Sequence, residues 1–218
     1  MNWTANGNVS QTAYTEADDV TFDNLGLAQP TVNLAQALHP TIVTVSGSAS
    51  YTLTGPGSIA GFGNFVMNGS GTLLLDTTNN TYADGTLVSS GTLQIGDGTI
   101  SSGPGSGPVT NNAAMVAMPG PAGETLSNSI SGTGTLTETG SGNLILTASN
   151  TYTGQTTISS GTLHARNANA LGASTAPLVN TSGGDLYVDQ NVNLLNPLTL
   201  GGNTIIWECP SKARKQYF

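Results

Sequence analysis

The sequence predicts an all-β protein, a right-handed parallel β-helix, on three observations. Segments of three to five aliphatic and β-branched residues are bounded by Gly, Ser or Asn along the chain, as expected for short strands between tight turns. No window shows a sustained helical stripe of apolar residues, apart from a weak run at 32–38. A long segment also occurs twice. Short strands without helical crossovers are best stacked as coils, in which each rung pairs with the next.

The duplicated segment covers residues 59–95 and 130–165. The two copies align without a gap through their first part, and the second copy then lacks one residue. Asn80 and Asn150 share one matched position, and we expect them to bond in a turn or stack as a ladder rather than touch a ligand. Eight apolar residues of the two copies are expected to point inward: Leu73, Leu75, Val88, Leu93, Leu144, Leu146, Ile158 and Leu163.

A single coil of this kind cannot fold alone. Ordering its backbone costs more entropy than the burial of four or five aliphatic side chains returns. Neighbouring coils must therefore cap each apolar face and complete the backbone hydrogen bonds. With about 20 to 25 residues per coil, we expect residues 1–207 to form one array of roughly nine or ten coils. The Gly- and Ser-rich stretch at 98–107 is expected to be a loop protruding from a coil rather than a linker.

Two strings in the second copy carry a family resemblance. Residues 132–146 read G-T-G-T-L-x-x-x-G-S-G-N-L-x-L, and residues 150–163 read N-T-Y-T-G-x-T-x-I-x-x-G-T-L. Together they resemble the autotransporter passenger-associated β-strand repeat, and Leu171-Gly172 resembles the L-G that closes that repeat. The upstream copy departs from the pattern at Asp84-Gly85 and at Phe65.

The resemblance implies an exported passenger segment of a much larger bacterial cell-surface protein, acting as an adhesive stalk or display scaffold and aiding secretion. It implies a location outside the cell, with attachment to the outer membrane through a part of the parent protein absent from this chain. Residues 1–7 carry no export signal, so we interpret the chain as a fragment. The expected partners are neighbouring coils of the parent protein and host or surface glycans or proteins.

Composition argues against some classes of protein. Only 7% of the residues are charged and the formal net charge is −8, which argues against nucleic-acid binding. No run of 18 apolar residues exists, so we expect no transmembrane segment in this chain. Residues 208–218 differ from the rest, because they hold three of the four basic residues and the single Cys209. We interpret this segment as a frameshifted or misassembled end, or as a true basic tail, and expect it to be disordered.

The chain offers few residues for chemistry. His39 precedes a proline in a turn, and His164 stands where Gln94 stands in the other copy, which predicts a solvent-facing position. One cysteine and two histidines do not make a zinc site. Gly96-Asp97-Gly98 and Gly183-Gly184-Asp185 are similar to calcium-binding β-roll turns, but the nonapeptide of those turns does not recur. We therefore predict no catalytic, cofactor-binding or metal-ligating residue.

The alternative function is a polysaccharide-active enzyme, a lyase or glycoside hydrolase, because parallel β-helices also host such enzymes. Hydrolysis needs two carboxyl groups about 5 to 9.5 Å apart. Asp76, Asp97 and Asp185 are not paired in the sequence, and Arg166 is the only basic residue before 208. The sequence therefore favours a structural or adhesive role, whereas aspartates clustered in a groove would favour the enzyme.

Overall fold

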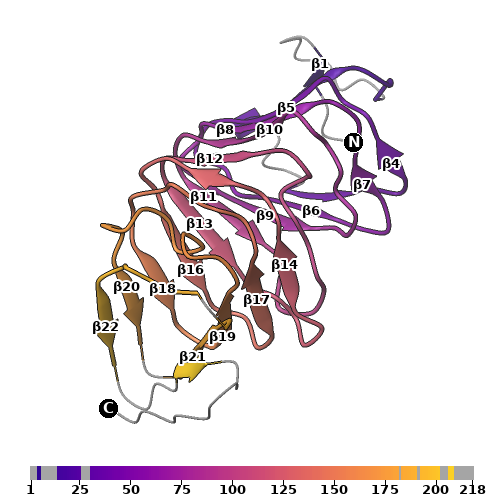
Figure 1. Cartoon of the computed structure of the whole chain (residues 1–218). Helices are drawn as coiled ribbons and strands as arrows, with labels where there is room; N and C mark the ends of the chain where they lie inside the picture. The colour runs from indigo at the N-terminus through magenta and orange to yellow at the C-terminus, as the bar shows by residue number, and fades with distance from the viewer. Residues whose placement is uncertain are drawn as a thin grey trace.

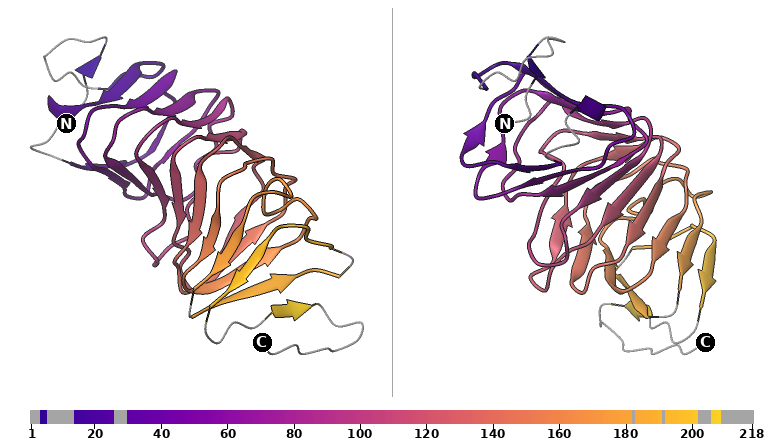
Figure 2. Two further views of the ribbon diagram at one scale, coloured as in Figure 1. Left: turned by 90° about the vertical axis from the view of Figure 1, so that its left-hand side faces the viewer. Right: turned by 180° about the vertical axis from the view of Figure 1, so that it is seen from behind.

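A computed structural model describes residues 4–5, 14–25, 30–181, 183–190, 192–201 and 206–208. Short strands are stacked along one axis from the N-terminal coils to the C-terminal ones, in an elongated and curved assembly (Figure 1 and Figure 2). Paired strands are parallel, except that β1 (Thr4–Ala5) runs antiparallel to β2 (Asp19–Phe22). The described residues form no α-helix. The expected all-β, parallel β-helical fold is confirmed.

Each coil has three sides, which the chain visits in a fixed order. The first sheet consists of β1, β2, β5 (Ile42–Val45), β8 (Asn64–Met67), β10 (Gly85–Val88), β12 (Val109–Asn111) and β15 (Ile130–Ser131). The second consists of β3 (Thr31–Asn33), β6 (Tyr51–Thr54), β9 (Thr72–Asp76), β11 (Thr92–Ile95), β13 (Ala114–Ala117), β16 (Thr135–Glu138), β18 (Thr156–Ile158), β20 (Leu178–Asn180) and β22 (Leu198–Leu200). The third side has two sheets, β4 (Ala37–Leu38) with β7 (Ser58–Ile59), then β14 (Glu124–Leu126), β17 (Asn143–Leu146), β19 (Gly161–Ala165), β21 (Gly184–Val188) and β23 (Ile206–Glu208).

Strand register shows that the coils differ in length. Leu75 pairs with Ile95 on the next coil, and Thr86 pairs with Val109, so the chain between the second pair of partners is slightly longer. The second sheet has nine strands within the described residues, and the stack makes about 8 turns. Nine successive strands on one side are separated by eight turns, so the described residues agree with the lower end of the expected nine or ten coils.

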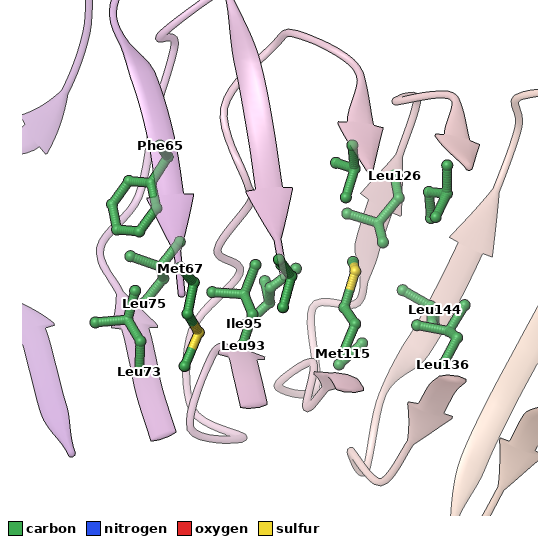
Figure 3. Close-up of a cluster of buried hydrophobic side chains, with 14 of the residues drawn as sticks. Phe65, Met67, Leu73, Leu75, Leu93, Ile95, Met115, Leu126, Leu136 and Leu144 are labelled. Atoms are coloured by element: carbon green, nitrogen blue, oxygen red, sulfur yellow. The ribbon is translucent and has the colours of Figure 1, made fainter. Parts of the chain in front are cut away.

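One hydrophobic core runs through the stack. Successive residues of a strand point to opposite faces, so alternate side chains enter the interior. All eight residues predicted to point inward are buried with a relative exposure of 0%, which confirms the prediction. Figure 3 shows how successive rungs supply the core, with Leu73 and Leu75 from β9, Leu93 and Ile95 from β11, and Met115 from β13.

The two copies of the repeat lie on different sides of the stack. In the first copy β8 and β10 belong to the first sheet and β9 and β11 to the second. The matching strands of the second copy are displaced by one side: β16 and β18 belong to the second sheet, and β17 and β19 to the third side. The separation of the two copies along the chain therefore corresponds to three coils plus one side.

Two expectations concern segments without strands. The stretch 98–107 is tied to the preceding coil, because Ser106 N donates to Tyr82 O and Asn80 Nδ2 donates to Gly103 O. It therefore packs on the stack more closely than the expected protruding loop. The expectation of disorder for 208–218 falls almost wholly outside the described residues, since only Glu208 is described, as the last residue of β23.

Candidate functional site

A polar hollow of about 520 Å³ opens on the third side of the stack. Three consecutive coils build its walls, through residues 78–80, 101–105 and 124–128. The rungs at 77–82 and 101–106 form no strand on this side, and they separate the β4–β7 sheet from the sheet that begins at β14. The hollow therefore lies where the sheet on the third side is interrupted.

Glu124 supplies the carboxyl group of the hollow. It precedes buried Leu126 by two residues and pairs with buried Leu144, so it occupies an inward-facing position of β14. Burial raises the pKa of Glu124 to about 7, against the opposing effect of backbone hydrogen bonds from Thr125 and Ser102. Near neutral pH the carboxyl is thus present both as an acceptor and as a donor.

The other polar groups of the walls are hydroxyls and amides. Ser102 is only 3% exposed, and its hydroxyl has no hydrogen-bond partner. Thr78 and Ser127 are exposed at the rim. Asn79 has a φ of 59°, in the left-handed region that asparagine tolerates better than most residues. No basic or aromatic side chain lines this hollow.

Asn80 and Asn150 hold the coils together beside this region and at its counterpart. Oδ1 of Asn80 accepts from the backbone N–H of Ile59 at 3.0 Å, and Nδ2 donates to Gly103 O at 3.1 Å on the next coil. Asn150 makes the same pair of bonds, from Ile130 N at 2.8 Å and to Ala170 O at 2.7 Å. Asn80 also bonds within its own turn, to Oγ1 and the carbonyl oxygen of Thr77, as expected for a turn. These bonds of Asn150 instead run to neighbouring coils, so each amide bridges two coils.

The second copy fills the space that the first leaves open. Asn80 donates to Gly103 O and Asn150 donates to Ala170 O, so Gly103 and Ala170 occupy equivalent places in the stack. Ala170 and Leu171 are buried in the core. A Cβ added to Gly103 would meet no atom within 4 Å. The hollow therefore lies beside the end of the first copy, and the equivalent place beside the second copy is filled.

A second carboxyl, that of Glu138, lies inside the core. Glu138 ends β16, is fully buried and accepts from Gly140 N at 2.9 Å with Oε1, while Oε2 has no partner. Burial raises the pKa of Glu138 to about 8. The equivalent residue of the first copy is Met67, also fully buried. The comparison of the copies did not single out this position, although the exchange of Met for Glu was visible in the sequence.

The two histidines lie far apart in the chain and each has an acidic partner. His39 Nδ1 lies 3.1 Å from exposed Glu16. His164 faces outward from β19 but is half-buried: its Nε2 lies 2.5 Å from Asp189, and its ring packs edge-on against Tyr187. Burial tends to raise the pKa of Asp189, but hydrogen bonds from His164 and Arg166 lower it overall. The side chain of His164 points to the outer face of β19, as predicted. Its contacts with Asp189 and Tyr187 could not be seen in the sequence.

The aspartates considered for hydrolysis are partly brought together. Asp76 and Asp97 lie on adjacent coils, and burial, followed by the charge of Asp97, raises the pKa of Asp76. Hydrogen bonds from Thr99 occupy Asp97 and lower its pKa. Neither residue lines the hollow.

Among the described residues no group of three or more His, Cys, Asp or Glu side chains is arranged to hold a metal. In the same part of the chain, no helix has the length and apolar character needed to cross a membrane.

Comparison with known proteins supports the resemblance. Residues 65–95 and 136–165 match the passenger-associated-transport-repeat family. Over 104 residues, 48% of the chain, the sequence is 40% identical to the adhesin BmaC autotransporter of Brucella suis biovar 1 (strain 1330), and the match spans 3% of that protein. No solved structure matches the chain. The two repeats and this similarity support the resemblance of the chain to an autotransporter passenger repeat protein.

Proposed function

We propose that this segment is a stalk or display scaffold in a much larger protein exported to the bacterial surface, and that its folding aids secretion. Its repeats and its similarity to an adhesin autotransporter support this role. Attachment to the outer membrane through another part of the parent protein belongs to the same proposal. We infer a non-enzymatic role, because the similar protein is named an adhesin.

The observation that carries this proposal is the continuity of the core. Buried side chains from Val20 to Val188 form one hydrophobic cluster that passes through every coil between them. Eight rung spacings of about 4.8 Å give the second sheet a length of roughly 38 Å. In such an array each coil is stabilised only by its neighbours, so the segment forms a rod whose stability is shared along its length.

The test is a charged substitution in the core, compared with one on the surface of the same strand. Leu144→Asp places a carboxyl at a fully buried position of β17, where desolvation or forced protonation costs several kcal/mol. Asn143→Asp adds the same group one residue earlier, at an exposed position. Surface display of the parent protein, measured by antibody labelling of intact cells, is expected to fall for Leu144→Asp and to stay unchanged for Asn143→Asp.

Parallel assays of polysaccharide cleavage separate the scaffold from the enzyme. His39→Ala, His164→Ala and Asp97→Ala are expected to leave display unchanged and to remove no activity. Unchanged display of Leu144→Asp would contradict the scaffold role. A cleavage activity that one of the three polar substitutions abolishes would establish the enzyme instead.

A further inference from the structure

We propose that the hollow beside Glu124 is a binding site for a neutral sugar residue, displayed on the side of the stack. This site is additional to the scaffold role, since the core packs without it in the second copy. The proposal rests on three features of the hollow: its size, the kind of groups in its walls, and the contrast between the two copies.

The size suits a small organic ligand. A hollow of about 520 Å³ falls in the range of roughly 300 to 1,000 Å³ that is usual for small-molecule sites. Its walls come from three coils that hydrogen bonds join, from Asn80 Nδ2 to Gly103 O and from Asn128 Nδ2 to Gly105 O, so the wall groups are held before a ligand arrives. Such preorganisation reduces the entropy lost on binding.

The wall chemistry selects a ligand rich in hydroxyl groups. A sugar hydroxyl both donates and accepts, and it needs partners of both kinds. Glu124, Ser102 and Ser127 supply a carboxyl and two hydroxyls, and Asn79 supplies an amide that can donate and accept. The Ser102 hydroxyl is buried without a partner, which is costly unless a ligand or water completes its bonding.

Other ligand classes are disfavoured by the same walls. An anionic ligand, such as a uronic acid or a phosphate, would meet no basic side chain there and would face Glu124. A flat aromatic or lipid ligand would find little apolar surface, because Leu126 is the only large apolar side chain in the wall. A cation remains the main competitor, and the experiment below separates it from a sugar.

The contrast between the copies shows how the hollow arises. Gly103, which follows the first copy, has open space beside it, whereas the equivalent residue after the second copy is fully buried Ala170. On the coil after Gly103, Glu124 presents its carboxyl to the hollow, whereas on the coil after Ala170 the side chains of Val192 and Leu194 pack against the core. The stack thus tolerates a closed, apolar version of this region after the second copy, and it has an open, polar one after the first copy.

Saturation-transfer NMR on the full 218-residue chain tests the site. The probes are the methyl glycosides of glucose, galactose, mannose and N-acetylglucosamine. Each glycoside is also measured with calcium chloride or ammonium chloride added as a competitor. At least one glycoside is expected to bind with a Kd in about the millimolar range, because the ligand is small and the site is open to solvent.

Three variants locate the binding. Gly103→Leu fills the hollow without backbone strain, because Gly103 does not have a positive φ, and it is expected to abolish the signal. Glu124→Gln keeps the shape and is expected to weaken binding at least tenfold. Thr137→Leu adds the same side chain to the outer face of the second sheet, at a half-buried position on β16, and should leave binding unchanged.

Specific outcomes overturn the proposal. It is wrong if none of the four glycosides binds, or if Gly103→Leu binds as well as the unchanged chain. It is also wrong if calcium or ammonium alone binds in a manner that depends on Glu124. Surface display of Gly103→Leu is expected to match that of the unchanged chain, so a failed sugar site and a failed scaffold role give different results.

Discussion

Glu138 makes the stability of the stack depend on pH, and replacing it with the residue of the first copy should remove most of that dependence, leaving the part due to Glu124. The perturbation is Glu138→Met, since Met67 fills the equivalent position and is fully buried. The two side chains have similar surroundings. A Cβ on Gly91 would lie 2.8 Å from Met67 Cε, and one on the equivalent Gly161 would lie 3.2 Å from Glu138 Oε1. Methionine should therefore fit with little repacking.

The magnitude follows from the raised pKa. Burial raises the pKa of Glu138 from 4.5 to about 8 in the folded chain. A carboxyl whose pKa is raised on folding contributes its full stability below the unfolded value and loses it as the pH rises toward the folded value. At about 1.4 kcal/mol per unit, folding should lose roughly 3 to 4 kcal/mol between pH 5 and pH 8 because of this group. Glu124, with a pKa of about 7, adds a loss of the same sign.

The substitution also removes one favourable contact. The N–H of Gly140 donates to Oε1 of Glu138, and methionine cannot replace that acceptor. A buried N–H without a partner costs about 1 to 3 kcal/mol at every pH. The two stability curves should therefore cross, with the unchanged chain the more stable at pH 5 and Glu138→Met the more stable at pH 8.

Urea unfolding of both chains, followed by circular dichroism at pH 5, 6, 7 and 8, measures this difference. Asp84→Asn removes an exposed carboxyl and serves as the control, which should retain the pH dependence of the unchanged chain. Parallel curves for the unchanged chain and Glu138→Met would show that Glu138 is not the buried, protonated acid inferred here.

The remaining predictions concern hydrogen bonds and glycines, all measured as free energies of unfolding in urea. Asn150→Ala should cost about 2 to 4 kcal/mol, because it leaves one backbone donor and one acceptor on neighbouring coils without a partner; a loss below about 0.5 kcal/mol would refute the bridge. Tyr152→Phe should cost about 1 to 2 kcal/mol through the lost bond to Thr156, 2.7 Å long and buried. Gly161→Ala should destabilise the chain strongly, because φ is +63° and the new Cβ would lie 2.5 Å from the carbonyl oxygen of Gly142. Gly103→Ala should be tolerated, because its Cβ would meet no atom within 4 Å. Equal losses of stability for the two variants would contradict this packing.

The coils and their inward residues could be predicted from the sequence because the signal is local. Alternation along a strand and glycine at the turns decide which side chains are buried, and both are visible within the sequence of a single coil. The inward position of Leu73 and Leu144 could be predicted from this pattern. The same residues and their neighbours also carry the family resemblance. The matched positions of Asn80 and Asn150 predict bonding in a turn or a ladder, whereas the bonds from each amide to both neighbouring coils depend on how the coils stack.

The placement of the two copies on different sides could not be predicted. The side on which the second copy lies depends on the number of residues in each coil between the copies. These coils differ in length, as the pairs Leu75–Ile95 and Thr86–Val109 show. A difference of a few residues in each coil therefore shifts the second copy to another side of the stack. The hollow was missed for another reason. Gly103 lies in a stretch that resembles an ordinary loop, and Glu124 comes close to it only when three coils stack. Glu138 was overlooked because its position was treated as variable in the repeat.

The most direct test of the account is the distance between two positions on one row of the second sheet. Thr52 and Val179 are joined by a continuous register through Leu74, Gln94, Val116, Thr137 and Thr157. Six rung spacings of about 4.8 Å place their Cα atoms roughly 29 Å apart. Spin labels at Thr52→Cys and Val179→Cys, with Cys209→Ser, report this distance by pulsed electron resonance. One narrow distribution near that value, allowing for the label arms, is the expected result. A broad distribution centred far beyond it would mean that the two copies fold as separate units joined at 98–107, and would contradict the continuous β-helix.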